Sequence, residues 1–191
     1  MKFRILLFAT IDSTNDYALS LAKEGIVEGT VVISDYQTKG RGRYKRTWVS
    51  PSGKNLLFSI VMRPLCRVNK VPLITHVTAR AVKETLETIA GITSTLKKPN
   101  DVLIKGRKVC GILTEIHSRA QTIDYCVIGV GINVNSVRKQ LVRGATSLFE
   151  ETGIDYSKEK ILTVFLKKFA HHYKLFFGHE TMRIHPKGKR K

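Results

Sequence analysis

Short apolar runs, typical of buried strands, alternate along this chain with three segments in which apolar residues recur at helical spacing. The strand-like runs are residues 3–9, 30–34, 55–62, 109–116 and 123–130. Residues 95–104 continue this pattern but contain Pro99, which predicts an edge strand or a bulge there. At 191 residues, the pattern predicts one domain with a core of its own, or one domain with a short appendage.

The helical segments begin and end at residues that suit helix termini. Asp12 or Ser13 is a candidate N-cap for the first helix. The second helix is predicted at residues 71–89, ahead of Gly91, and the third at residues 157–177. The third helix carries an apolar stripe that we expect to pack into the core, formed by Ile161, Phe165, Phe169, Tyr173 and Phe176.

Residues 39–48, with the sequence KGRGRYKRTW, contain five cations and two glycines and end at the only tryptophan of the chain. Such a segment cannot pack as a core strand or helix, because its charges would need partners and its glycines raise the entropic cost of ordering it. We expect a mobile loop between two buried strands, similar to an active-site lid. Its arginines suit phosphate or carboxylate oxygens. Composition alone is more typical of a solvated basic loop or a nucleic-acid-binding arm.

The chain has 33 Lys and Arg against 15 Asp and Glu, a formal net charge of +18. Such an excess favours polyanionic partners, whether nucleic acid, anionic lipid or an acidic protein. The loop holds five of the cations and residues 183–191 hold another five, so +8 remains for the rest of the chain. We therefore expect a domain over residues 1–178, ordinary in charge for a soluble enzyme, followed by a basic tail at 179–191.

The three cysteines are far apart and follow no metal-binding or CxxC spacing. Cys110 and Cys126 lie within apolar runs, where we expect buried free thiols. This use of cysteine favours a reducing, cytoplasmic location. The start of the chain is interpreted as a first strand rather than a cleavable leader, and no run approaches the ~20 apolar residues of a membrane span.

Polar and cationic residues recur where the predicted strands end: Ser13, Thr14, Asn15, Gln37, Lys97 and Asn133. These groups suit an anionic cofactor and charge on a transferring phosphorus, for which catalysis is mainly positioning and electrostatics. No serine–histidine–aspartate arrangement, zinc motif or P-loop is present, and we assign the six histidines no role. Gly129 and Gly131 permit a close backbone approach. The residues themselves thus predict a nucleotide-dependent transferase or ligase.

Four separated stretches are more specific together: DSTN at 12–15, Gln37 followed by GRGRYKRTW at 40–48, KKPNDVLIKGRKVCGILTE at 97–115, and GVGINVN at 129–135. Their order and spacing resemble those of the biotin protein ligases, also called biotin–[acetyl-CoA-carboxylase] ligases, over roughly residues 5–177. The resemblance implies an α/β (α+β) fold, in which a mixed β-sheet is flanked by helices as in class II synthetase-like catalytic domains. It also implies an enzyme that makes biotinyl-5′-adenylate from biotin and ATP and then biotinylates one lysine of a biotin carboxyl carrier protein.

The resemblance also implies roles for individual residues. The ureido ring of biotin would be hydrogen-bonded by Ser13, Thr14 and Gln37. Asn15 would support that turn, and Gly111 and Leu113 would line the biotin pocket through their backbone.

The loop would fold over biotin and the adenylate phosphate through Arg41, Gly42 and Arg43, and Trp48 would help to close it. Lys97 would contact the biotin carboxylate and the α-phosphate, so Lys97 and Arg41 are the expected catalytic residues. The nucleotide would lie by Asn100 and Asn133. Mg²⁺ would accompany ATP, held mostly by phosphate oxygens and water, so no protein metal ligand is expected.

The chain departs from the family pattern in several places. Lys45 stands where the loop usually carries a glycine, and Lys98 replaces the tryptophan that usually follows the catalytic lysine. The first motif begins about ten residues from the start, so we expect no N-terminal winged helix and no DNA-binding repression by that device. About fourteen residues follow Phe177, so we also expect no C-terminal β-barrel domain. A homodimer formed through exposed sheet edges is one way to complete the ATP site.

Two other functions are considered beside biotin ligation. A lipoate or octanoate ligase has the same fold, but its glycine-rich loop is arranged differently from GRGRYKRTW. A non-enzymatic, basic nucleic-acid-binding module would account for the loop and the tail. Such a module usually has stacking aromatic residues between its cations, or a helix-turn-helix pattern, and this sequence shows neither.

Overall fold

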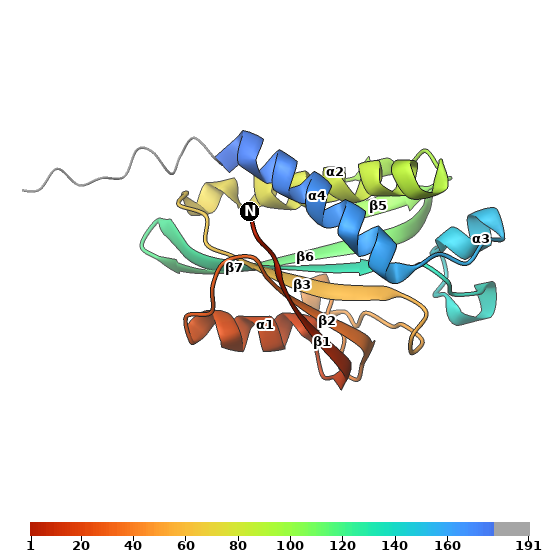
Figure 1. The fold of residues 1–191 in the computed structure, drawn as a ribbon, viewed down its shortest axis with the longest axis horizontal. Helices are drawn as coiled ribbons and strands as arrows, with labels where there is room; N and C mark the ends of the chain where they lie inside the picture. The colour runs from red at the N-terminus through yellow and green to blue at the C-terminus, as the bar shows by residue number, and fades with distance from the viewer. Residues whose placement is uncertain (178–191) are drawn as a thin grey trace, which may run out of the picture.

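A computed structural model describes residues 1–177, whose seven strands form one mixed β-sheet with helices on both faces (Figure 1). The strand order is β1-β2-β3-β7-β6-β5-β4; β1 and β2 are parallel, and all other neighbours are antiparallel. The strands are β1 Arg4–Ile11, β2 Thr30–Gln37, β3 Leu56–Met62, β4 Thr95–Lys97, β5 Asp101–Ile104, β6 Arg107–Arg119 and β7 Thr122–Ile132. This arrangement confirms the predicted fold class. The predicted tail at 179–191 lies outside the described residues.

Two long helices cover one face of the sheet, and a shorter helix covers the other. The α-helices are α1 Thr14–Lys23, α2 Val71–Ala90, α3 Leu148–Thr152 and α4 Lys158–Phe177. Helices α2 and α4 pack against each other on one side of the sheet, whereas α1 contacts β2, β3 and β7 from the opposite side (Figure 1). Ser13 caps α1 by accepting a hydrogen bond from Asp16 N at 3.4 Å, and Gly91, at φ +65°, ends α2 as predicted.

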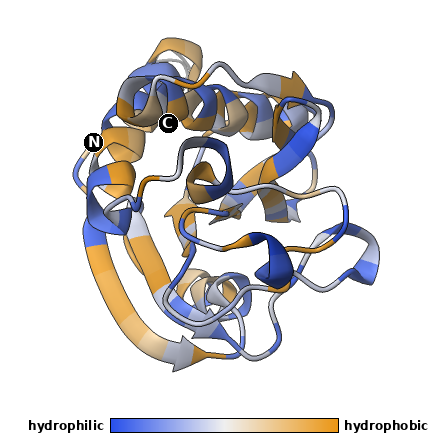
Figure 2. Cartoon of the chain, turned by 90° about the vertical axis from the view of Figure 1, so that its right-hand side faces the viewer, coloured by the Kyte–Doolittle hydropathy of each residue, from blue (hydrophilic) through white to orange (hydrophobic). Residues whose placement is uncertain are grey.

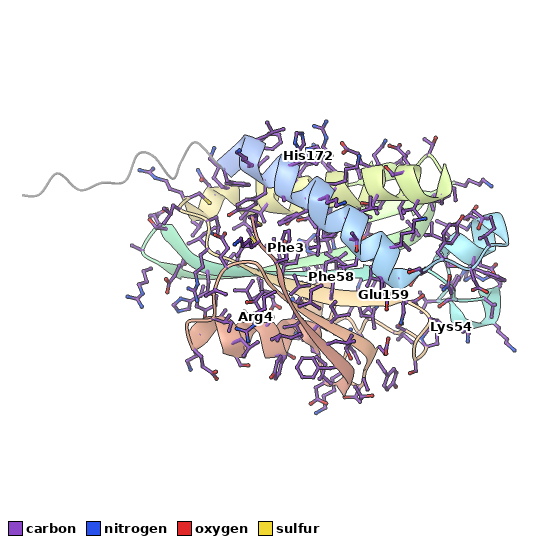
Figure 3. The ribbon with its side chains drawn as sticks, in the orientation of Figure 1. Phe3, Arg4, Lys54, Phe58, Glu159 and His172 are labelled. Atoms are coloured by element: carbon purple, nitrogen blue, oxygen red, sulfur yellow. The ribbon has the colours of Figure 1, made fainter. Side chains whose placement is uncertain are left out.

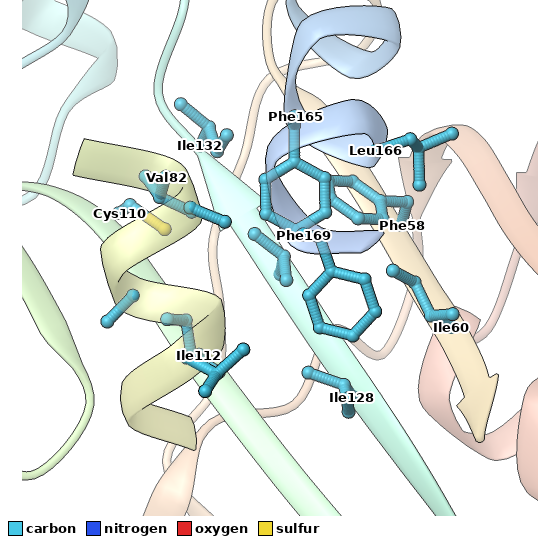
Figure 4. Close-up of a cluster of buried hydrophobic side chains, with 14 of the residues drawn as sticks. Phe58, Ile60, Val82, Cys110, Ile112, Ile128, Ile132, Phe165, Leu166 and Phe169 are labelled. Atoms are coloured by element: carbon cyan, nitrogen blue, oxygen red, sulfur yellow. The ribbon is translucent and has the colours of Figure 1, made fainter. Parts of the chain in front are cut away.

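The main core lies between the sheet and the α2–α4 pair. The strands are mostly hydrophobic, whereas the loops that face the viewer in Figure 2 are mostly hydrophilic. Phe58 of β3 points from the sheet toward α4 (Figure 3), where its ring lies 5.1 Å from that of Phe165 in an edge-to-face contact (Figure 4). The predicted stripe of α4 is wrong at its last position. Phe177 is buried and Phe176 is 42% exposed, because Phe177 continues the four-residue step from Tyr173.

Two segments differ from the sequence-based expectation. The apolar run at 3–9 predicts a buried strand, but β1 is an edge strand on which Ile5 and Leu7 are 52% and 69% exposed. Residues 95–104 lie at the other edge of the sheet, as Pro99 predicts, but they form a hairpin rather than one interrupted strand. Pro99 lies in the turn between β4 and β5, where its fixed φ and missing N–H are tolerated.

Buried polar groups and thiols complete the interior. His172 on α4 (Figure 3) is buried, and its Nε2 lies 2.9 Å from the carboxylate of Glu84 on α2. This histidine therefore has a structural role that the sequence did not indicate. Cys110 and Cys126 are buried free thiols, as predicted, and burial raises the pKa of both. Within residues 1–177, no helix combines the length and the apolar character needed to cross a membrane.

Candidate active site

On the side of the sheet that faces α1, the centre of strands β6 and β7 carries glycines instead of residues with side chains. Gly111 of β6 and Gly131 of β7 are register partners, and Gly129 lies one pleat further along β7. A Cβ atom on Gly129 would come within 2.0 Å of Asn15 Oδ1, and one on Gly131 within 2.5 Å of the Trp48 ring. Both neighbours thus approach the backbone more closely than any side chain would permit. This confirms the close approach that the sequence predicts for Gly129 and Gly131.

The turn at the start of α1 is joined to two strands by buried hydrogen bonds. Gln37 Oε1, at the end of β2, accepts from Thr14 N at 2.7 Å and from Thr14 Oγ1 at 3.0 Å. The Ser59 hydroxyl on β3 lies 2.6 Å from Asn15 Oδ1 and 2.8 Å from Thr14 Oγ1. Because Ser59, Thr14 and Asn15 are almost inaccessible to solvent, these contacts fix the turn rigidly. Ser59 was not among the sequence candidates.

Glu115 on β6 connects that turn to the cationic loop. One carboxylate oxygen accepts from Asn15 Nδ2 at 2.8 Å, and the other lies 2.6 Å from Arg41 Nη2. The second terminal nitrogen of Arg41 contacts Asp16 on α1. Burial opposes the charge on Arg41, but Glu115 and Asp16 outweigh it and raise the pKa of the guanidinium. Arg41 is therefore held by carboxylates of the protein itself, and Glu115 is a second residue absent from the sequence candidates.

The loop at 39–48 has a compact form in this structure. Its two ends are tied by hydrogen bonds from Trp48 N to Gly40 O at 2.9 Å and from Gly42 N to Arg46 O at 2.7 Å. A short 3₁₀ turn, Arg43–Lys45, lies at its tip. The Trp48 ring rests on the glycine surface of β6 and β7, and its Nε1–H is buried without a hydrogen-bond acceptor among the described residues. Such an unsatisfied buried donor suits a polar ligand atom.

Two adjoining cavities lie beneath and beside this loop. The smaller has a volume of ≈ 60 Å³ and is lined by the turn, the loop and the glycine strands. Every residue predicted for biotin except Lys97 lines it: Ser13, Thr14, Asn15, Gln37, Arg41, Gly42, Arg43, Gly111 and Leu113. The hydrogen-bonding turn and the flat glycine surface suit a small ring with polar edges.

The larger cavity, of ≈ 350 Å³, is lined by both cationic and apolar residues. The cationic residues include Lys97 and the unusual Lys98. Among the apolar residues are Leu141, Val142 and Ala145, from a segment for which the sequence gave no prediction. The candidates predicted for the nucleotide line this cavity, with the exception of Arg41: Arg43, Trp48, Lys97, Asn100 and Asn133. The cavity suits a ligand that has an anionic part and a flat apolar part.

The two asparagines of the larger cavity are anchored to the protein. Asn133 Nδ2 donates to Thr146 O at 3.0 Å, and Asn100 Nδ2 donates to Ile112 O at 2.9 Å. Asn100 Oδ1 in turn accepts from Arg43 Nη1 at 3.4 Å. Across residues 1–177, no group of three or more His, Cys, Asp or Glu side chains is placed to hold a metal ion. The two asparagine side chains are thus held in fixed positions at the wall of the larger cavity.

Comparison with known proteins places the chain among biotin-related ligases in sequence and in fold. The bifunctional ligase/repressor BirA of Bacillus spizizenii is 37% identical over 173 residues, which are 88% of this chain and 53% of that protein. A biotin–[acetyl-CoA-carboxylase] ligase of Paracoccus denitrificans is 34% identical over 86% of this chain and 70% of its own length. The biotin protein ligase from Aquifex aeolicus, solved in complex with biotin and ATP, has a TM-score of 0.79 at 32% identity, over 92% of this chain and 72% of that one.

The chain spans about half the length of the BirA proteins that it matches. Residues 7–133 of this chain match the Biotin/lipoate A/B protein ligase family. This range includes the turn at the start of α1, the loop at 39–48, and strands β6 and β7. With the four motifs, the fold and the identity to its relatives all in agreement, the chain belongs to the biotin/lipoate A/B protein ligase family.

Proposed function

We propose that this chain catalyses ATP-dependent activation of biotin and transfer of biotin to a lysine of a biotin carboxyl carrier protein. The observation that supports this most strongly is that two cavities adjoin. The hydrogen-bonding turn at residues 13–15 lines the smaller one, and Lys97, Lys98 and the apolar residues of 141–145 line the larger one. The relatives whose names mention biotin include a ligase that is 34% identical to this chain and a structure, solved with biotin and ATP, that has the same fold. None of the named relatives quoted above is a lipoate ligase, which favours biotin over lipoate or octanoate.

In the first half-reaction, a carboxylate oxygen of biotin attacks the α-phosphorus of ATP. The new oxygen–phosphorus bond forms biotinyl-5′-adenylate, and the bond from the α-phosphorus to its bridging oxygen breaks to release pyrophosphate. Ser13, Thr14 and Gln37 orient the ureido ring, and Lys97 and Arg43 stabilise the negative charge of the biotin carboxylate and the α-phosphate as they approach. Arg41, the second catalytic residue expected from the resemblance, is paired with Asp16 and Glu115 in this structure and would reach the substrates by leaving these partners. Mg²⁺ would accompany ATP and, when bound on the phosphate oxygens, would neutralise part of their charge.

In the second half-reaction, the neutral amine of the acceptor lysine attacks the acyl carbon of the adenylate. An amide bond forms, the carbon–oxygen bond to AMP breaks, and the amine gives up one proton to solvent. A net charge of +18 would draw an acidic acceptor domain toward this surface. We place the reaction in the cytoplasm, where the buried Cys110 and Cys126 stay reduced. A homodimer is one way to complete the nucleotide cavity.

The decisive test is pyrophosphate release by the purified protein with Mg·ATP and biotin, lipoate, octanoate or no acid. We expect release with biotin alone. Release with lipoate or octanoate would move the chain to the sister branch of its family. Silence with all three acids from a folded protein would contradict the proposal and favour a nucleic-acid-binding module.

Lys97→Ala tests the proposed catalytic lysine. Lys97 lines the larger cavity and is exposed to solvent, so the substitution removes a charge without disturbing the core. We expect adenylate formation to fall by at least ~100-fold, the usual loss when one preorganised charge donor is removed, with an unchanged thermal unfolding midpoint. Lys98→Ala is the matched control, and we expect a smaller loss from it. Near-normal turnover by Lys97→Ala would contradict the assignment.

A further inference from the structure

The two carboxylate oxygens of Glu115 contact two different parts of the site. Oε2 accepts from Asn15 Nδ2 at 2.8 Å, and Oε1 lies 2.6 Å from Arg41 Nη2. Asn15 belongs to the turn at the start of α1, whereas Arg41 belongs to the loop at 39–48. One side chain of β6 thus joins the turn that we expect to bind biotin to the loop that we expect to cover it.

On the side of the turn, this connection is rigid. Asn15 is 4% exposed, and its Oδ1 accepts from Ser59 Oγ at 2.6 Å. Its Nδ2 also donates to Leu113 O at 3.3 Å, so the amide is held by both β3 and β6. Asn15 packs on the backbone of Gly129, where a Cβ atom would come within 2.0 Å of Oδ1, and it therefore has no room to turn away. Glu115 consequently has a fixed partner on this side.

On the side of the loop, the connection can open. The two terminal nitrogens of Arg41 contact different elements, because Nη2 lies against Glu115 of β6 and Nη1 against Asp16 of α1. A guanidinium held by two carboxylates is fixed in position and in orientation. The side chains of Arg41, Glu115 and Asp16 nevertheless remain 40%, 24% and 51% exposed, so water can replace either partner. The pair therefore favours the compact loop without locking it permanently.

Holding Arg41 also holds the aromatic cover of the smaller cavity. Arg41 directly follows Gly40, whose carbonyl accepts from Trp48 N at 2.9 Å. The Trp48 ring lies over Gly111 and Gly131, where added Cβ atoms would come within 2.8 Å and 2.5 Å of it. Both Arg41 and Trp48 line the smaller cavity. If Arg41 leaves its carboxylates, the loop segment that carries the ring loses an attachment to the sheet.

We propose that Glu115 is a positioning residue that fastens the loop over bound biotin through Arg41 and thereby sets how long biotin stays bound. This inference rests on the proposed function. Biotin enclosed beneath the loop leaves only after the contact between Arg41 and Glu115 has opened. Because Glu115 also binds Asn15, a ligand that orders the turn at residues 13–15 stabilises the closed loop, and the closed loop in turn stabilises the bound ligand.

The test measures biotin dissociation from the purified protein by chasing bound radiolabelled biotin with an excess of unlabelled biotin. We expect Glu115→Gln to release biotin about tenfold faster, because loss of one partner of a hydrogen-bonded charge pair acts mainly on dissociation. Asp12→Asn is the matched control, since Asp12 also ties the loop, through Lys39 at 2.8 Å, but in a pair whose side chains are 61% and 75% exposed. Its dissociation rate should stay within about twofold of the wild type.

A double-mutant cycle with Arg41→Met separates fastening of the loop from support of the turn. Arg41→Met should also release biotin about tenfold faster, and adding Glu115→Gln to it should change the rate by less than about twofold. An equal acceleration by Glu115→Gln in both backgrounds would overturn the inference, because Glu115 would then act through Asn15 alone.

The inference also fails if Glu115→Gln holds biotin as long as the wild type does, or if Asp12→Asn accelerates release equally. If Glu115→Gln does not fold, Arg41→Met carries the test, and an unchanged dissociation rate in that variant is the contradicting result. A wild-type protein that neither binds biotin nor releases pyrophosphate with it would instead contradict the proposed function.

Discussion

Gly129 of β7 lies directly beneath the turn at the start of α1, where a Cβ atom would come within 2.0 Å of Asn15 Oδ1. Its Cα faces Asn15, whose side chain links Ser59 on one side to Glu115 on the other. A methyl group added at this position would therefore disturb the contacts of Asn15 with both β3 and β6. Asn15 could not move away without breaking a buried hydrogen bond to one of these neighbours, each of which costs about 1–3 kcal/mol when left unsatisfied.

Gly129→Ala is expected to destabilise the protein by about 1–3 kcal/mol, as overpacked interiors usually do, and to weaken biotin binding by more than tenfold. Urea unfolding and biotin titration measure the two effects. The control is the same substitution in an Asn15→Ala background, where the clash is absent and the further loss should be small. Equal losses in both backgrounds would show that Gly129 acts through something other than Asn15.

At the scale of elements, the loop at 39–48 contains a local conflict at its tip. Tyr44 and Lys45 have φ values of +56° and +59°, in the left-handed region that glycine adopts without cost. A residue with a Cβ atom is destabilised there by about 1–2 kcal/mol. Lys45 carries a Cβ atom at this position, so the compact form of the loop is less stable than it would be with glycine there.

Lys45→Gly is expected to favour the compact loop by about 1 kcal/mol and thereby to tighten biotin binding by about fivefold. Lys45→Ala is the matched control, because it removes the same charge but keeps a Cβ atom at the strained position. Isothermal titration with biotin measures both variants. Equal affinities for the alanine and glycine variants would indicate that the charge of Lys45, rather than its backbone conformation, determines loop closure.

The sequence predicted the elements well where periodicity is strong, and most residues of its motifs that were candidates for the site line one of the two cavities. It predicted β1 as buried, because apolar residues at an edge strand look the same as those at a central one. It missed Ser59 and Glu115, whose contacts with Asn15 join residues 44 and 100 positions apart. A polar residue inside an apolar strand carries no local sign of such a partner. The apolar wall at 141–145 follows no periodic pattern, and only the fold brings it to the cavity.

At the scale of the whole molecule, the partly buried carboxylates of Glu84 and Glu151 link separate elements. Burial opposes ionisation of Glu84, but hydrogen bonds from His172 and Arg80 outweigh it and hold its pKa below the ordinary value of 4.5. The same balance applies to Glu151 of α3, where Thr146, Lys105 and Arg107 outweigh burial and lower its pKa. Helix α4 is thus joined to α2, and α3 to the β5–β6 hairpin, by ionised groups.

These lowered pKa values predict the direction of the acid response. Below about pH 4.5 the unfolded chain takes up protons at Glu84 and Glu151 that the folded protein resists, so their contribution is complete above that pH and is lost as pH falls further. Urea unfolding from pH 7 to pH 3 measures the loss. Glu84→Gln should be less stable at pH 7 and decline less steeply below pH 4.5. An unchanged slope in Glu84→Gln would contradict the assigned role.

The position of Trp48 gives this molecule a built-in optical probe. The indole is the only tryptophan in the chain, rests on Gly131 and borders both cavities. When the loop lifts, the ring must pass from the glycine surface into water, which shifts its fluorescence emission to longer wavelength. Stopped-flow fluorescence of the unmodified protein can therefore time the arrival of each substrate and the movement of the loop in separate phases, before any bond is made.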